Sequence, residues 1–193
     1  KYNLKTKSLD SLRHLNDKSI WLANMINYVV PYDGKMYATG IGCGPLVYDI
    51  KTNQLENLSL CPGKLVSTNY MYIARDGTLY TAFSNIHDTI YSINLHNGKK
   101  EKFSFPTEFK SSQEINVTSF VEDENHRIWC GTSNHGIAIL NPLTKKWEKC
   151  LIPDADLKIS PCLSLASVKN GMVWCQTSDD LYLIRTNNFK YKR

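Results

Sequence analysis

The stretch Asn125-His-Arg-Ile-Trp-Cys-Gly-Thr132 has three related copies along the chain. These copies are Asp33-Gly-Lys-Met-Tyr-Ala-Thr39, Asp76-Gly-Thr-Leu-Tyr-Thr-Ala82 and Asn170-Gly-Met-Val-Trp-Cys-Gln-Thr177. The aromatic residue near the middle of each copy recurs with a period of about 45 residues. Asp-Gly and Asn-Gly pairs adopt the positive φ angles of tight hairpin turns. Each copy is therefore predicted to begin with a turn and to continue as a strand.

Each repeat contains four short segments with strand character, separated by turn signals. An apolar stretch precedes the turn, and a third apolar run and a more polar fourth segment follow the aromatic strand. Four strands per repeat at this period are typical of a β-propeller blade. The sequence therefore predicts an all-β chain in which 1–193 is one propeller segment of four-stranded antiparallel blades. The predicted blades span 26–60, 69–104, 116–150 and 162–193, and 1–12 is the outer hairpin of a partial blade.

The outer hairpin gives the clearest internal match. Residues 2–12 align almost residue for residue with residues 48–58, at an offset of 46. The chain thus holds four inner hairpins and five outer hairpins, or about four and a half blades. Because a closed propeller has a whole number of blades, we expect a piece of a larger ring, or an arc whose free ends are covered by missing chain or by a neighbouring molecule. Leu9–Ile26 has weak strand and helix signals and is expected to be a long connection.

Composition excludes several classes of protein. The 193 residues are 42% hydrophobic and carry a net charge of +5, with no apolar run long enough for a membrane helix. We therefore expect no direct membrane insertion of this segment. Basic residues recur at one place in each repeat, as on a protected outer strand, and not on one nucleic-acid-binding face. These residues are Lys99, Lys100, Lys102, Lys145, Lys146, Lys149, Lys190, Lys192 and Arg193.

Cysteine and histidine spacing argues against metal and catalytic sites. The six cysteines include no CxxC pair, and the five histidines accompany no HExxH or GxSxG motif. We expect no catalytic residue, metal or cofactor in this segment. Cys130 and Cys175 occupy equivalent positions in neighbouring blades, too far apart for a disulfide, so none is predicted between them.

The third repeat, over residues 115–144, resembles the two-component regulator propeller repeat. The shared features are Glu-Asp, Ile-Trp, a small residue, Gly-Thr and a strand that ends in Asn-Pro. The resemblance implies the periplasmic sensor domain of a hybrid two-component system, tethered to the inner membrane. Such sensors usually have two seven-bladed propellers ahead of a membrane helix, a histidine kinase and a response regulator. Many sense carbohydrate, so the resemblance also implies an oligosaccharide ligand. The motif itself is structural and holds blades together.

The loops between the second and third strands of each blade are the predicted ligand contacts, because propellers present variable loops on rigid blades. Amide, imidazole and carboxylate groups there suit sugar hydroxyls, which need both donors and acceptors. The alternative is that these side chains contact only solvent and bind no ligand. Trp21, in the long connection, either stacks on a sugar or packs between blades. The candidate residues are Asn85, His87, Asn134, His135, Asp179, Asp180 and Trp21.

Two other functions use the same surface. One is a propeller lyase or cyclase, similar to the virginiamycin-inactivating lyases, in which His and Glu converge at the central channel. The other is a protein-interaction platform. The fold alone does not separate these alternatives. The partners expected for a sensor are an oligosaccharide, neighbouring blades or a second propeller, and a second copy of the chain in a homodimer.

Overall fold

A computed structural model describes residues 2–3, 5–9, 26–42, 44–61, 66–109, 114–150 and 161–193. In these ranges the chain forms four four-stranded antiparallel sheets and one two-stranded sheet. The helical content of the described residues is one 3-10 turn, η2 (Thr107–Phe109). The all-β prediction is confirmed. Most of the long connection, with Trp21, lies outside the described residues.

Four consecutive strands form each four-stranded sheet, and we number these sheets blades 1 to 4. Blade 1 contains β3 (Ile26–Tyr32), β4 (Lys35–Gly40), β5 (Leu46–Asp49) and β6 (Gln54–Asn57). Blade 2 contains β7 (Thr68–Ile73), β8 (Thr78–Phe83), β9 (Ile86–Asn94) and β10 (Lys100–Ser104). Blade 3 contains β11 (Val117–Glu122), β12 (Ile128–Thr132), β13 (Ile137–Asn141) and β14 (Lys146–Cys150). Blade 4 contains β15 (Ser164–Val168), β16 (Met172–Gln176), β17 (Leu181–Arg185) and β18 (Tyr191–Lys192). The two-stranded sheet pairs β1 (Tyr2–Asn3) with β2 (Ser8–Leu9).

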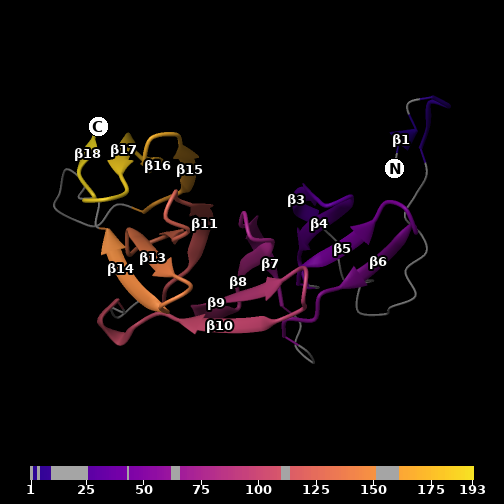
Figure 1. The fold of residues 1–193 in the computed structure, drawn as a ribbon, viewed down its shortest axis with the longest axis horizontal. Coiled ribbons are helices and arrows are strands. Elements are labelled where there is room, and N and C mark those ends of the chain that lie inside the picture. Colours follow the sequence, from indigo (N-terminus) through magenta and orange to yellow (C-terminus); the bar gives the residue numbers. More distant parts are fainter. Residues whose placement is uncertain are drawn as a thin grey trace.

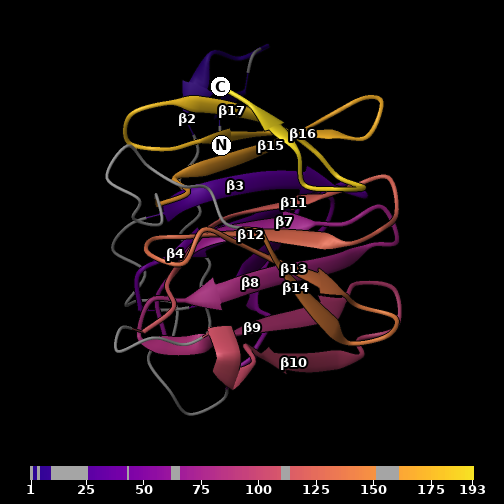
Figure 2. The same ribbon diagram turned by 90° about the vertical axis from the view of Figure 1, so that its left-hand side faces the viewer.

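The four blades follow one another around an open arc (Figure 1). Their first strands, β3, β7, β11 and β15, lie on the concave side, and each contacts the first strand of the next blade. The turns between first and second strands lie at one end of the blades, on the right of Figure 2. The loops between second and third strands therefore lie at the opposite end, because antiparallel neighbours reverse direction.

The inner turns lie at the predicted pairs but take two forms. Blade 1 uses a two-residue turn and blade 4 a three-residue loop over 169–171, and in each the two residues of the predicted pair have positive φ. In blades 2 and 3 only the second residue of the pair has a positive φ. The backbone N–H of that residue donates a hydrogen bond to the carbonyl three residues before it. The φ angles are 45° and 70° at Asp33 and Gly34, 69° and 70° at Asn170 and Gly171, 78° at Gly77 and 60° at His126.

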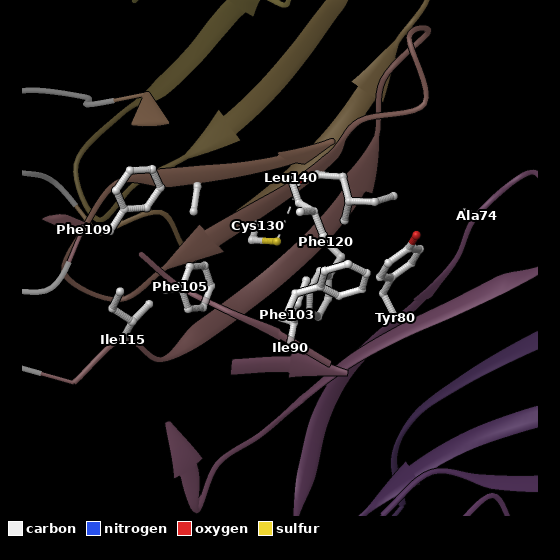
Figure 3. Close-up of a cluster of buried hydrophobic side chains, with 12 residues drawn as sticks. Ala74, Tyr80, Ile90, Phe103, Phe105, Phe109, Ile115, Phe120, Cys130 and Leu140 are labelled. Carbon is white, nitrogen blue, oxygen red and sulfur yellow. Dashed lines mark hydrogen bonds between the residues drawn. The ribbon is translucent and has the colours of Figure 1, made fainter. Parts of the chain in front are cut away.

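Hydrophobic residues fill the space between adjacent blades. One cluster joins blades 1 and 2 around Tyr37 and Leu79, and another joins blades 3 and 4 around Trp129 and Val173. The largest joins blades 2 and 3, where Tyr80, Phe103, Phe120 and other side chains meet (Figure 3). Leu79 and Tyr80 belong to different clusters because successive strand residues point to opposite faces of a sheet. The two faces of a middle blade are thus both buried.

The Glu-Asp pair of the third repeat is a structural joint between blades. The buried Glu122 carboxylate accepts hydrogen bonds from Arg75 N at 2.8 Å and from His126 Nδ1 at 2.7 Å. Asp123 Oδ2 accepts hydrogen bonds from Trp129 Nε1 and Arg127 Nε, both at 2.8 Å. The acids have hydrogen-bonding partners that offset the cost of burying their charge. This pair fixes blade 3 against blade 2 through Arg75 and orients Trp129.

The Gly-Thr pair of the same repeat is also structural. A Cβ added at Gly131 would stand 2.8 Å from Cys162 Sγ, which is closer than side chains normally approach. Thr132 Oγ1 donates to Gly136 O at 2.7 Å and accepts from His135 N at 3.0 Å, which closes the following loop. The Thr132 carbonyl accepts from Cys162 N of blade 4 at 2.9 Å. Both residues therefore serve the joint between blades 3 and 4.

The end of the arc at blade 4 leaves apolar side chains exposed. Trp129 in β12 is 0% exposed because blade 4 covers it, whereas Trp174, at the equivalent place in β16, is 37% exposed. Leu181 and Leu163 of the same blade are also exposed. The same residue type at the same position of the repeat thus differs in burial according to whether another blade follows.

Candidate functional site

Side chains of blades 2 and 3 meet at the end of the blades that carries the loops between second and third strands. His87 lies near the start of β9 and faces the segment that leads into blade 3. Its Nδ1 lies 2.7 Å from Asn116 Oδ1 and its Nε2 lies 3.0 Å from Glu114 Oε2. Asp88 Oδ1 accepts a hydrogen bond from Ile115 N at 2.9 Å. His87 and Asp88 therefore hold Asn116 in place between the blades.

Asn134 and His135 extend this group from the corresponding loop of blade 3. Asn134 Nδ2 donates to the Glu114 carbonyl at 3.3 Å, and His135 Nδ1 donates to Asn134 Oδ1 at 2.5 Å. Burial lowers the pKa of His135 below its ordinary value, and the positive charge of Lys149 lowers it further. Together, His87, Asn116, Glu114, Asn134 and His135 form a hydrogen-bonded strip across two blades. His135 is buried, so its imidazole packs inside the protein and stabilises the loop.

A hollow of about 280 Å³ adjoins this strip, between the first strands of blades 2 and 3. Its polar lining is supplied by Tyr70, Ser84, Asn116 and Thr118. Tyr70 is 41% exposed and presents both an aromatic ring and a hydroxyl group. The hollow therefore combines an apolar ring with hydroxyl and amide groups, which is the chemistry of sites for small polar ligands. This hollow is the candidate functional site.

A β-bulge shapes each side of this site, in blades 2 and 3, and recurs in blade 1. The pairing of first and second strands shifts between Thr68 and Tyr70 in blade 2 and between Val117 and Ser119 in blade 3. Blade 1 has the same shift between Ile26 and Tyr28. Such bulges re-aim side chains and are frequent beside functional sites. An exposed tyrosine follows the bulge in blades 1 and 2.

Sequence reasoning missed the four residues that give the hollow its polar lining. A signal existed, since Asn-Tyr occurs at 27–28 and again at 69–70, at equivalent points of two repeats. A polar residue followed by an aromatic residue at the start of an inner strand is unusual for a buried strand. Ser84 and Asn116 carry no such signal, because the blades must pack before these loops lie beside one another.

The predicted site residues fall into separate groups. His87, Asn134 and His135 lie together in the strip described above. Asn85 is next to Ser84 and accepts a hydrogen bond from Ser67 N at 3.4 Å. Asp179 and Asp180 lie in blade 4, where Asp180 pairs with Arg193 at 2.6 Å. Trp21 lies outside the described residues. The structure thus brings three of the predicted residues together and places two at the far end of the arc.

A second hollow of about 350 Å³ lies at the opposite end of the blades, near the inner turns. Its acids are already bonded within the chain, since Arg75 and His126 bind Glu122 and Arg127 binds Asp123. This hollow is part of the structural joint between blades. Among the described residues, no three metal-binding side chains are gathered as a metal site would require.

The repeat that holds this joint has known relatives. Residues 111–134 match the family model of the two component regulator propeller. This stretch is similar to a two component regulator propeller repeat. The matched stretch covers β11 and β12, the Glu122–Asp123 joint and one edge of the candidate site. No curated protein matches the chain.

Solved structures share the fold. The extracellular domain of BT3049 from B. thetaiotaomicron, described as a hybrid two component system, is 20% identical with a TM-score of 0.68. The match covers 100% of this chain and 25% of that domain. The extracellular domain of BT4673 from the same organism, also described as a hybrid two component system, is 21% identical with a TM-score of 0.67, over 87% and 22% of the two chains.

A more distant match is the WD40 repeat domain of RRP9, which is 10% identical with a TM-score of 0.64, over 86% of this chain and 50% of that one. WD40 repeats form propellers, so the likeness in fold extends beyond the domains of two component systems. The chain spans about a quarter of the length of the extracellular domains that it resembles. No helix in the described ranges has the length and apolar character needed to cross a membrane. The chain has the fold of a β-propeller segment.

Proposed function

We propose that this chain is part of the extracytoplasmic, ligand-sensing propeller of a hybrid two-component signalling protein, and that its ligand is a glycan-derived oligosaccharide. The observation that carries the proposal is the hollow beside the exposed Tyr70, with Asn116 and Thr118 on its wall. The propeller repeat at residues 111–134 supports the signalling context. The full-length protein would then lie in the periplasm, tethered to the inner membrane, and its kinase would lie outside this segment.

The chemistry of the hollow suits a sugar. A sugar ring offers an apolar C–H face and hydroxyl groups that both donate and accept hydrogen bonds. Tyr70 supplies a ring face, and the Asn116 amide and the Ser84 hydroxyl supply donors and acceptors. His87 acts as a positioning residue, because its contact with Asn116 fixes the orientation of that amide. At about 280 Å³ the hollow would take one or two sugar units of a longer ligand.

The exposed face of blade 4 supports the proposal that this segment is completed by further blades. Trp174 and Leu181 are 37% and 52% exposed, although the equivalent face of blade 3 is covered. We expect another blade of a seven-bladed ring to pack here. A second propeller or a second copy of the chain would bury the same residues. Contiguous exposed apolar groups of this kind mark interaction surfaces.

The test is a thermal-shift screen of the intact extracytoplasmic region against a panel of neutral and acidic oligosaccharides. A ligand at 100 times its Kd should stabilise the fold by about 2.7 kcal/mol. Tyr70→Ala should abolish that shift. Tyr191→Ala is the matched control, because Tyr191 is also 41% exposed but lies on the outermost strand of blade 4. Equal ligand-induced thermal shifts in the two variants would show that the ligand binds outside the hollow beside Tyr70.

Two other outcomes would reject the sensor. Chemical conversion of the oligosaccharide during the assay would favour a lyase or cyclase. Stability unaffected by the whole panel would favour a protein-interaction platform.

A further inference from the structure

Two sulfur atoms lie together at the joint between blades 3 and 4. Cys162 precedes β15 and Cys175 lies in β16, and their Sγ atoms are 3.2 Å apart. Both side chains are fully buried in the cluster that surrounds Trp129. This distance is shorter than the roughly 3.5–4.0 Å optimum for non-bonded carbon atoms, which are smaller than sulfur. The two sulfurs are therefore in direct contact and face each other.

The backbone holds the two cysteines in this arrangement. Leu165 pairs with Cys175 across the β15–β16 ladder, and Leu163 N donates to Gln176 O at 2.8 Å. Cys162 N is tied to Thr132 O of blade 3 at 2.9 Å. A disulfide requires sulfur atoms about 2.05 Å apart, so closure needs about 1.2 Å of approach.

We propose that Cys162 and Cys175 form a disulfide bond that staples the segment before β15 to β16. The thiolate of one cysteine attacks the disulfide of an oxidised thiol–disulfide oxidoreductase or of oxidised glutathione, and one acceptor thiol leaves. The second cysteine then attacks the mixed disulfide and releases the other acceptor thiol. The chain loses two protons and two electrons, and the acceptor gains them. Because both sulfurs are buried, the exchange occurs before blade 4 packs onto blade 3.

The occurrence of this bond in the cell rests on the proposed extracytoplasmic location, where disulfides persist. The chemical pairing does not depend on it and can be measured in vitro, whatever the ligand is. The bond would close a short loop around the inner turn of blade 4, the blade at the open end of the arc. It would restrict the unfolded chain there and strengthen a blade that lies at one end of the arc and packs against blade 3.

Cys130 provides an internal control. It lies in the cluster between blades 2 and 3, whereas Cys162 and Cys175 lie in the cluster between blades 3 and 4. The thiol of Cys130 contacts the carbonyl of Ile128 at 4.0 Å. Burial raises the pKa of the Cys130 thiol, so it is a poor nucleophile in the folded chain. The cluster of described residues around Cys130 contains no other cysteine, so Cys130 is expected to remain reduced under conditions that oxidise the pair.

The test is to refold the reduced 193-residue chain in a mixture of reduced and oxidised glutathione, alkylate it in denaturant and digest it with trypsin. Trypsin places Cys162 in peptide 159–169 and Cys175 in peptide 170–185, with one cysteine in each. Mass spectrometry should find these two peptides linked, and the link should disappear after reduction. Alkylation of both cysteines, or linkage of either one to a different cysteine, would overturn the proposal.

A stability measurement gives a second readout. Reduction should lower the Tm of the oxidised protein by roughly 5 °C or more, as expected for loss of a short-loop disulfide. The Cys162→Ala/Cys175→Ala double variant should show the same Tm with and without reductant. Cys130→Ala should keep the reductant-dependent shift. A shift that survives in the double variant, or that Cys130→Ala removes, would refute the assignment even if peptide mapping is incomplete.

Discussion

Replacing Trp129 and Trp174 separately by alanine measures what the following blade contributes to stability. Trp129 is fully buried, donates a 2.8 Å hydrogen bond to Asp123 and packs edge-on against Phe189 of blade 4. Buried Trp→Ala changes cost about 3–5 kcal/mol, and these contacts place Trp129→Ala near 5. Trp174 is 37% exposed and its loss opens no closed cavity. At about 25 cal/mol per Å² over the buried part of a side chain of about 200 Å², Trp174→Ala costs about 3 kcal/mol.

Urea denaturation of the 193-residue chain, followed by intrinsic fluorescence and far-UV circular dichroism, tests this difference. A gap of about 2 kcal/mol corresponds to roughly 1 M urea in midpoint. Trp129→Phe keeps an aromatic ring, loses the donor to Asp123, and should cost about 1–2 kcal/mol. Equal midpoints for Trp129→Ala and Trp174→Ala would refute the argument that a following blade buries the anchor residue. In a longer chain with a fifth blade, the two costs should converge.

Two further predictions concern charged groups. The lowered pKa of His135 means that the unfolded chain binds a proton more readily than the folded one, so stability should fall as pH drops through and below about 6.5. His135→Gln should reduce that fall in urea titrations between about pH 7.5 and 5, and an unchanged pH slope would contradict the assignment. Arg127→Ala should cost about 3 kcal/mol because it removes a partner of the buried Asp123 carboxylate, whereas Lys145→Ala, at an exposed pair, should cost under about 1 kcal/mol. Equal urea midpoints for these two variants would rule out a structural role for the buried pair.

The blades were predictable because their signals are local. Turn residues and the alternation of buried and exposed positions act within a few residues, and repetition in four segments reinforced each signal. The form of the turns was less predictable. Asp76 and Asp123 accept hydrogen bonds from the backbone two residues ahead, which favours a longer turn than the Asp-Gly or Asn-His pair suggests.

The candidate site was only partly predictable. His87, Asn134 and His135 were identified as loop residues with suitable chemistry, and they do lie together. Tyr70 and Thr118 immediately precede the apolar stretches of their repeats and were not identified as candidates. The bulge that turns them toward the hollow depends on how first and second strands pair, and sequence spacing does not reveal that shift.

The sequence by itself determined the repeat and the order of strands. Both follow from short-range conformational preference and from the two-residue period of a strand. Only the tertiary structure decided which equivalent residues are buried, which loops meet and which sulfur atoms touch. Trp129 and Trp174 have the same local sequence context, yet one is covered and the other is exposed. Burial depends on what packs against a face, and Cys162 meets Cys175 because β15 runs antiparallel to β16, which brings the residue before β15 near the end of β16.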